Sequence, residues 1–230
     1  MAKRKRKTKI TEEERRRKRQ VAEQNKILKS ILIIIVIITA GFFLFIFVSD
    51  AISSFTYKDV EFDIVKFCDA GPPCLVTYHT TLPVKVSGDS VRVVRPEEKT
   101  TDYNFYIRND PRELSVDFVG KIAYKELMVI NVEEGSFMCE GKESIAIANL
   151  AKLYELMGTR VITDPTATCD ALGRYSLVNV VSGNETKIEH FYPACYTITI
   201  KDCEILEGTE KFMIDTFVEI NKALKNGGLN

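Results

Sequence analysis

The feature that most constrains this chain is an apolar run from Ile31 to Val48, in which Thr39 is the only polar residue. Fifteen of its eighteen residues are Ile, Leu, Val or Phe. As a helix rising ~1.5 Å per residue it would cover about 27 Å, close to the ~30 Å hydrocarbon thickness of a bilayer. Its composition favours insertion by roughly 4 to 9 kcal/mol. The run therefore predicts a transmembrane helix, which we place at residues 30–48.

The two flanks of this run carry opposite charges. Residues 1–29 hold thirteen Lys and Arg against four Glu, a net charge of +9. Because the whole chain has 32 basic and 32 acidic residues, residues 49–230 have a net charge of −9. Basic flanks stay on the cytoplasmic side of a membrane. We therefore expect a basic cytoplasmic tail at residues 1–29 and an extracellular C-terminal domain.

A cleaved signal peptide is the alternative interpretation of the apolar run. Such a peptide normally has an apolar part of ~7–15 residues, followed by small residues at the cleavage site. The run here is longer, and Ser49-Asp50-Ala51 fits a cleavage site poorly. We favour an uncleaved single-pass signal anchor, followed by a polar linker at residues 49–54.

The basic tail shows helix signals. Thr11 and Glu14 form a capping box, and Glu12 lies four residues before Arg16, a stabilising spacing on a helix. Basic residues beside a membrane attract anionic lipid head groups, with about 1 kcal/mol for each. Nucleic-acid binding is the alternative for such a run. A basic block beside an apolar run, however, normally indicates which flank lies on the cytoplasmic side of the membrane. We predict the lipid bilayer as the partner of the tail, and no nucleic acid.

The cysteines indicate an oxidising compartment. All six lie beyond the apolar run, and an even number on that side predicts up to three disulfides. They are Cys68, Cys74, Cys139, Cys169, Cys195 and Cys203. The segment Asp69–Pro73 forms a turn between two strand-like runs, so we expect the pair Cys68–Cys74.

Strand geometry restricts the other pairs. Cys195 and Cys203 lie at the two ends of a predicted strand, about 26 Å apart at ~3.3 Å per residue, which exceeds the ~7 Å limit for bridged Cα atoms. Cys139 and Cys203 each follow a predicted strand, so parallel strands would bring them to one sheet edge. We expect Cys139–Cys203 and Cys169–Cys195. No C-x-x-C motif is present and the chain has two histidines, so we expect no metal site.

Residues 55–120 have the period-2 pattern of β-strands. Val60, Phe62 and Ile64 alternate with acidic residues. Tyr103, Phe105 and Ile107 alternate with Asn104, Tyr106 and Arg108. Leu75–Val86 is a further strand candidate, in which Pro83 indicates an edge position or a bend. This part is predicted to be a β-rich subdomain.

Residues 121–230 read as an α/β subdomain. Leu127–Ile130 is a continuous apolar run, as in a strand covered on both faces. A helix is expected from Glu143 to Met157, ended by Gly158. Segments 177–181 and 186–191 flank a hairpin or loop, and a last helix places Met213, Phe217, Ile220 and Leu224 on one face. The predicted fold class is α+β, with an N-terminal transmembrane helix before the β-rich and α/β subdomains of one extracytoplasmic domain.

No complete catalytic constellation is found in the sequence. The segment from Gly135 to Ser144 resembles a phosphate-binding loop, but it has five residues between its glycines and Glu143 in place of the hydroxyl residue. His79 and His190 are isolated histidines in strand patterns, typical of hydrogen-bonded surface residues. We predict no cofactor and consider an enzyme the less favoured class.

Two places in the outer region remain candidates for function. In open α/β sheets, ligands bind at the carboxyl ends of strands, which here selects Gly135, Ser136, Asp164 and Asp202 as candidate binding residues. Asn184-Glu185-Thr186 is an N-glycosylation sequon in a predicted turn, so Asn184 is a candidate glycosylation site.

Four segments together resemble single-span surface proteins of small-genome, DPANN-like archaea, a group with no known activity. They are Tyr57–Phe62, Thr80–Val84, Tyr103–Arg112 and Ile147–Ala151. The resemblance implies a cell-envelope setting, and it assigns no catalytic residue.

The sequence thus favours a membrane-anchored extracytoplasmic binding or structural domain, whose partner is an envelope protein or glycan. One alternative is an extracytoplasmic hydrolase or transferase with its site at the strand ends of the α/β subdomain. Another is a sensor that signals through the basic tail to a cytoplasmic partner.

Overall fold

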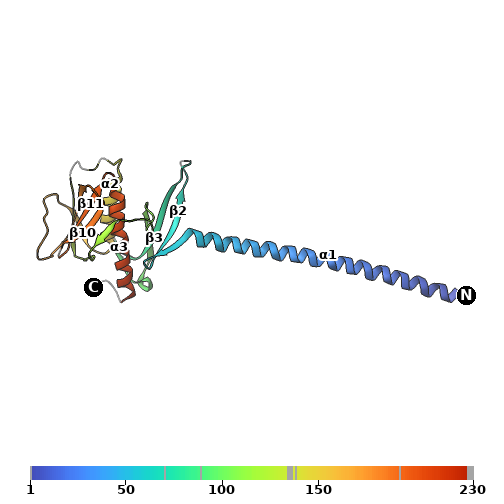
Figure 1. Cartoon of the computed structure of the whole chain (residues 1–230). Coiled ribbons are helices and arrows are strands. Elements are labelled where there is room, and N and C mark those ends of the chain that lie inside the picture. The colour runs from blue at the N-terminus through green and yellow to red at the C-terminus, as the bar shows by residue number, and fades with distance from the viewer. Residues whose placement is uncertain are drawn as a thin grey trace. The chain divides into compact units, whose positions relative to one another are not determined.

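The computed structural model describes residues 2–226 except residues 70, 89, 134–136, 138 and 192 (Figure 1). One helix, α1, runs from Ala2 to Ser53. Within it, Glu14–Ile46 is long and apolar enough to cross a membrane. The basic tail, the apolar run and most of the expected linker therefore form one continuous helix. The rest of the chain is a separate compact unit, and we call residues 54–226 the body.

The first sheet of the body, sheet A, is antiparallel and has β3 at its centre. β2 pairs with the first part of β3, β4 pairs with its last part, and β5 pairs with its middle on the opposite side. β1 extends the sheet beyond β2. The strands are β1 (Ser54–Tyr57), β2 (Val60–Phe67), β3 (Leu75–Ser87), β4 (Ser90–Val93) and β5 (Thr101–Ile107).

Pro83 is accommodated in this central strand by a gap between two partners. β2 pairs with β3 only as far as His79, and β4 pairs with it from Val84 onward. Pro83 lies between these two paired segments. No strand of the described residues pairs with it on this side, so no partner requires the N–H group that proline does not have. The sequence expectation of an edge position or a bend is thus met by a local edge within a paired strand.

The second sheet, sheet B, has six strands in the order β6-β10-β11-β9-β7-β8. β7, β8, β9 and β11 are parallel, while β10 runs antiparallel to β11 and parallel to β6. The strands are β6 (Asp117–Val119), β7 (Leu127–Val132), β8 (Arg160–Thr163), β9 (Ser176–Gly183), β10 (Lys187–Phe191) and β11 (Cys195–Lys201).

Two details of sheet B differ from the sequence expectation. β6 precedes residue 121 but belongs to sheet B, so the change from one sheet to the other falls between Ile107 and Asp117. β9 and β10 do not form a hairpin, because β11 lies between them. β9 and β10 each pair with β11, which comes later in the chain. The turn residues between β9 and β10 do not predict this pairing.

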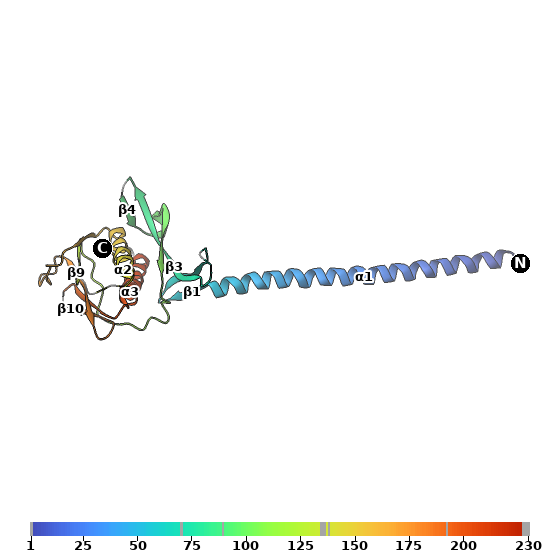
Figure 2. The same ribbon diagram turned by 90° about the horizontal axis from the view of Figure 1, so that it is seen from above.

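Two helices lie between the sheets, α2 (Lys142–Leu156) and α3 (Ile205–Lys225) (Figures 1 and 2). α3 contacts β10 and β11 on one side and β2 on the other, and α2 contacts β8 and β4. α3 is therefore buried nearly all round, and even Thr209, Glu210 and Thr216 are buried. The body is a three-layer arrangement with α3 in the middle.

A buried carboxylate connects α3 to the end of β5. Glu210 is 2% exposed, and its Oε1 accepts a hydrogen bond from the Arg108 backbone N–H at 2.8 Å. Its Oε2 accepts from the backbone and side-chain N–H groups of Asn109 at 2.9 and 2.8 Å. Burial raises the pKa of Glu210, and these hydrogen bonds act in the opposite direction. The three donors satisfy a carboxylate that would otherwise be costly to bury.

Three disulfides reinforce the body, and they are the three pairs expected from the sequence. Cys68–Cys74 closes the β2–β3 hairpin. Cys139–Cys203 joins the segments that follow β7 and β11, with Cα atoms 5.5 Å apart. Cys169–Cys195 attaches the loop after β8 to the start of β11.

The backbone of α3 lies unusually close to β11 at Gly208. A Cβ atom added there would be 2.6 Å from Cδ1 of Ile200 and 2.9 Å from Cγ2 of Ile198. Both isoleucines are fully buried, so they cannot move into solvent. The absence of a side chain at this position sets the distance between helix and sheet.

We predict that Gly208→Ala destabilises the protein. In an exposed helix this change would stabilise by ~1 kcal/mol, whereas overpacking a dense core costs about 1–3 kcal/mol, so the expected net loss is up to about 2 kcal/mol. Urea unfolding of the full chain in detergent measures it. Ile200→Val removes the clashing Cδ1, so the double variant should lose less than the sum of the two single changes. A Gly208→Ala variant more stable than the wild type would contradict the close approach.

Candidate functional site

The sequence-predicted site residues are distributed along one edge of sheet B. Gly135 and Ser136 lie outside the described residues. Asp164 follows β8 and Asp202 follows β11, so both lie at the carboxyl ends of parallel strands as expected. The strand order, however, places β7 and β9 between β8 and β11. Three strand spacings of ~4.8 Å separate the two strands by about 14 Å.

The side chain of Asp164 also forms hydrogen bonds within its own turn. Its Oδ1 accepts hydrogen bonds from the backbone N–H and the hydroxyl of Thr166, at 2.9 and 2.7 Å. These bonds lower the pKa of Asp164. Asp202 has a positive φ of 49° in the turn before α3. The two carboxylates thus have separate local surroundings, which gives the hydrolase or transferase alternative no support from geometry.

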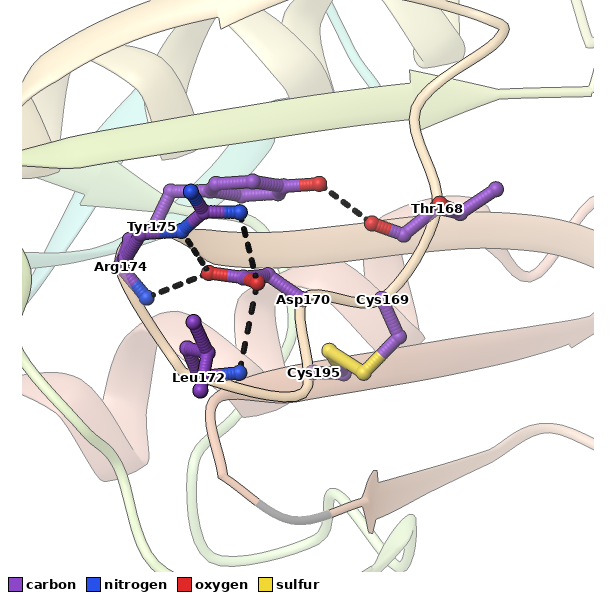
Figure 3. Close-up of a disulfide and its surroundings, with 7 residues drawn as sticks. All are labelled: Thr168, Cys169, Asp170, Leu172, Arg174, Tyr175 and Cys195. Atoms are coloured by element: carbon purple, nitrogen blue, oxygen red, sulfur yellow. Dashed lines mark hydrogen bonds and ion pairs between the residues drawn. A yellow bond between two sulfur atoms is a disulfide. The ribbon is translucent and has the colours of Figure 1, made fainter.

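The loop between β8 and β9, residues 164–175, crosses the face of sheet B that is opposite to the helices (Figure 3). Parallel strands need such a crossover, and a helix usually forms it. Here the loop packs Ala167 and Tyr175 on a small cluster of Val129, Leu177 and Cys195. The Cys169–Cys195 disulfide therefore holds a crossover that has no helix of its own.

Asp170 organises the end of this loop. Its Oδ2 accepts from the backbone N–H and Nε of Arg174 at 2.7 and 3.0 Å, and its Oδ1 accepts from the backbone N–H of Leu172 at 3.3 Å (Figure 3). The Arg174 side chain is the main cause that lowers the pKa of Asp170 to about 2. The Tyr175 hydroxyl donates to the Thr168 carbonyl next to the disulfide. These contacts indicate a structural role for the loop.

The outer face of sheet A is the more promising functional surface. The inner face packs on α3, with the rings of Phe105 and Phe217 5.2 Å apart. Because side chains alternate across a strand, the residues between the inner ones point the other way. We define the outer face by Glu61, Asp63, His79, Thr81, Asn104 and Tyr106.

His79 is at the centre of this outer face and is held on both sides of its ring. It pairs in register with Asp63 on β2 and Tyr106 on β5. Its Nδ1 lies 3.5 Å from Oδ2 of Asp63, and its Nε2 lies 2.9 Å from Oδ1 of Asn104. The rings of His79 and Tyr106 are 5.0 Å apart. The imidazole is thereby fixed in orientation.

A hollow of about 390 Å³ lies beside His79. It is lined by Ser54, Phe55, Thr56, Glu61, Asp63, His79, Thr80 and Thr81. Carboxylate and hydroxyl oxygens in this lining accept hydrogen bonds, and the hydroxyl groups also donate them. The arrangement suits the binding of a polar group.

The strand pattern predicts that His79 is a hydrogen-bonded strand residue, and the structure confirms it. The sequence does not predict its contacts with both Asp63 and Asn104. Each residue lies on the same side of its own strand, which the period-2 pattern shows. The register that brings the three strands together depends on pairing across 16 and 25 residues of sequence, for which no local signal exists.

The other predicted surface residues have simple surroundings. His190 stacks on Tyr196 with ring centroids 4.9 Å apart, beneath the backbone of Gly120. Asn184 is exposed in the loop between β9 and β10, as a glycosylation site requires. Its glycosylation stays a prediction.

No family model, curated protein or solved structure matches this chain.

We predict that Asp170→Asn destabilises the body in a pH-dependent manner. The pKa of Asp170 is depressed from 3.8 to about 2, so its contribution is fully present above pH ~4 and is lost as the pH falls through about 2. The melting temperature of the variant should be lower than that of the wild type at pH 7, and the two should converge near pH 2. Arg174→Gln removes the main cause of the lowered pKa but keeps the backbone N–H donors. The melting temperature of this variant should therefore depend less on pH between 4 and 2 than that of the wild type. A gap that stays constant from pH 7 to pH 2 would refute the ion pair.

Proposed function

We propose that this chain is a single-pass membrane protein whose body stands outside the cytoplasm and binds a protein or glycan of the cell envelope. In this proposal the apolar part of α1 is an uncleaved signal anchor. The basic tail stays in the cytoplasm and contacts anionic lipid head groups.

Three observations support the location. Glu14–Ile46 is long and apolar enough to span a bilayer. The charges of the two flanks, +9 and −9, follow the rule that basic segments stay inside. All six cysteines are in the body and form three disulfides, which persist in oxidising compartments.

The observation that carries the binding function is the hollow on the outer face of sheet A. It combines hydrogen-bonding side chains with a histidine held by Asp63 and Asn104. A rigid polar surface of this kind binds a partner without large rearrangement. The same face lies on the side of the sheet away from the buried α3.

We predict that the tail charge sets the topology. Replacing Arg15, Arg16, Arg17 and Arg19 with Glu should invert part of the molecules, because the net charge of the tail then falls from +9 to +1. Protease added to intact cells should digest the body of the wild type but leave the inverted fraction protected. Lys at the same four positions is the control and should behave as the wild type. A wild-type body protected from protease would contradict the proposed location.

We further predict that Asp63→Ala with His79→Ala weakens envelope binding at least tenfold. Full-length protein in lipid nanodiscs is exposed to fractionated envelope proteins and glycans, and retention is measured by surface plasmon resonance. Lys201→Ala, at an exposed end of β11, is the control and should leave binding unchanged. The proposal fails if the wild type retains neither class of molecule.

A further inference from the structure

Sheet edges are the places where a protein can pair with another chain, and β5 is the exceptional edge of the body. Among the residues that the structure describes, five strands pair on one side only, namely β1, β4, β5, β6 and β8. Four of them have three or four residues, whereas β5 has seven. Short edge strands limit unwanted pairing. The long edge of β5 has no such protection.

The composition of β5 leaves its edge open as well. Natural edges often carry Lys or Pro to block pairing. Tyr103–Ile107 contains no charged residue and no proline. The one charged residue of the strand, Asp102, is at its start and pairs with Lys99 at 2.7 Å.

The register shows which backbone groups face outward. Val94 N–H donates to the Pro83 carbonyl at 3.0 Å, so odd-numbered residues of β3 direct their backbone groups towards β4 and even-numbered ones towards β5. In the pairing of β3 with β5, even-numbered residues of β3 lie opposite odd-numbered residues of β5. The N–H and C=O groups of Asp102, Asn104 and Tyr106 therefore point away from β3. Arg108 is the next even-numbered residue, and its N–H donates a hydrogen bond to Glu210.

A groove of about 380 Å³ lies along this strand. Helix α2 lines it with Ile145, Asn149 and Lys152, one turn or so apart on the same helical face. The remaining lining residues are Phe67, Leu75, Thr77, Tyr103, Asn104, Phe105, Tyr106 and Arg108. Phe67, Leu75 and Tyr106 are each more than 40% exposed. The groove thus joins outward-facing backbone groups to apolar side chains.

These features fit one extended peptide segment. A strand added to a sheet lies ~4.8 Å from its neighbour, and it satisfies outward N–H and C=O groups while alternate side chains fill adjacent pockets. A second copy of this chain would bring a whole sheet behind its own edge, towards α2. A single segment needs only one strand's width.

The charges of the groove indicate the composition of that segment. Its charged lining residues are Arg108 and Lys152, both basic, in a region of the chain whose net charge is −9. Lys152 lies 5.6 Å above the Tyr103 ring and 3.7 Å from Glu155. Acidic residues in the bound segment complement Arg108 and Lys152, and apolar residues contact Ile145 and Phe67.

We propose that the free edge of β5 and the groove along α2 bind an extended, acidic segment of a partner protein, which adds to sheet A as a further strand. This inference goes beyond the proposed function, because the described residues that line the groove are different from those that line the hollow beside His79.

The test uses full-length protein in lipid nanodiscs and a display library of random eight-residue peptides. Selected peptides should be rich in acidic residues that alternate with apolar ones. Methylating the backbone nitrogens on one edge of a selected peptide should reduce its affinity at least tenfold, whereas methylation on the other edge should have little effect. Arg108→Gln should also reduce affinity about tenfold.

A matched pair of variants tests the strand edge itself. Asn104→Pro removes an outward N–H, a change that edge strands tolerate, and should abolish peptide binding. Asn104→Ala keeps this N–H and removes only the side chain, so it should weaken peptide binding far less than Asn104→Pro does. Thermal unfolding checks that both variants fold, and the methylated peptides give the answer independently if Asn104→Pro does not.

Several outcomes would overturn the inference. Selection of no peptide by a wild type that still retains an envelope molecule would refute it and leave the proposed function standing. Equal binding of peptides to Asn104→Pro and to the wild type would place them elsewhere. A concentration-dependent dimer that Asn104→Pro abolishes would assign the edge to a second copy. If the wild type retains no envelope protein or glycan, that result refutes the proposed function instead.

Discussion

The body depends on the burial of α3 between two sheets. An amphipathic helix normally presents one polar face to water, but α3 is covered by sheet B on one side and by sheet A on the other. Polar residues on such a helix need internal partners. Thr209 and Thr216 donate to carbonyl groups one turn earlier, and Glu210 accepts three hydrogen bonds from the end of β5. The Glu210 contacts also connect α3 to the end of β5 in sheet A, and Gly208 allows the close approach of α3 to sheet B.

The two sheets use this support differently. Two disulfides cross-link sheet B, because Cys139–Cys203 joins the segments that follow β7 and β11 and Cys169–Cys195 attaches the crossover loop to the start of β11. Its candidate carboxylates, Asp164 and Asp202, are three strands apart. Sheet A has a polar outer face around His79 and one long unprotected edge. Two of the three disulfides thus cross-link sheet B, and the surfaces suited to recognition lie on sheet A.

Much of the fold was predictable because it is recorded in local patterns. The alternation in Tyr103–Ile107, the buried face of Met213, Phe217 and Ile220, and the stop at Gly158 each follow from side-chain direction or backbone freedom within a few residues. The pairing of β9 with β11 instead of β10, and the membership of β6 in sheet B, were not predictable in this way. These choices depend on which distant strand offers the better buried neighbour. The contact of Asp63, His79 and Asn104 arises from the same long-range register.

The sequence alone determined the apolar run Ile31–Val48, the opposite charges of its flanks, the position of all six cysteines after this run, and the periods of most helices and strands. Each of these is a property of neighbouring residues, so the order of amino acids is sufficient to derive it. Only the tertiary structure decided that α3 lies between two sheets, that Pro83 fits a gap between β2 and β4, and that β5 keeps one edge unpaired. Those outcomes require the pairing of segments far apart in the chain, where the energies of burial and hydrogen bonding are compared over the whole molecule.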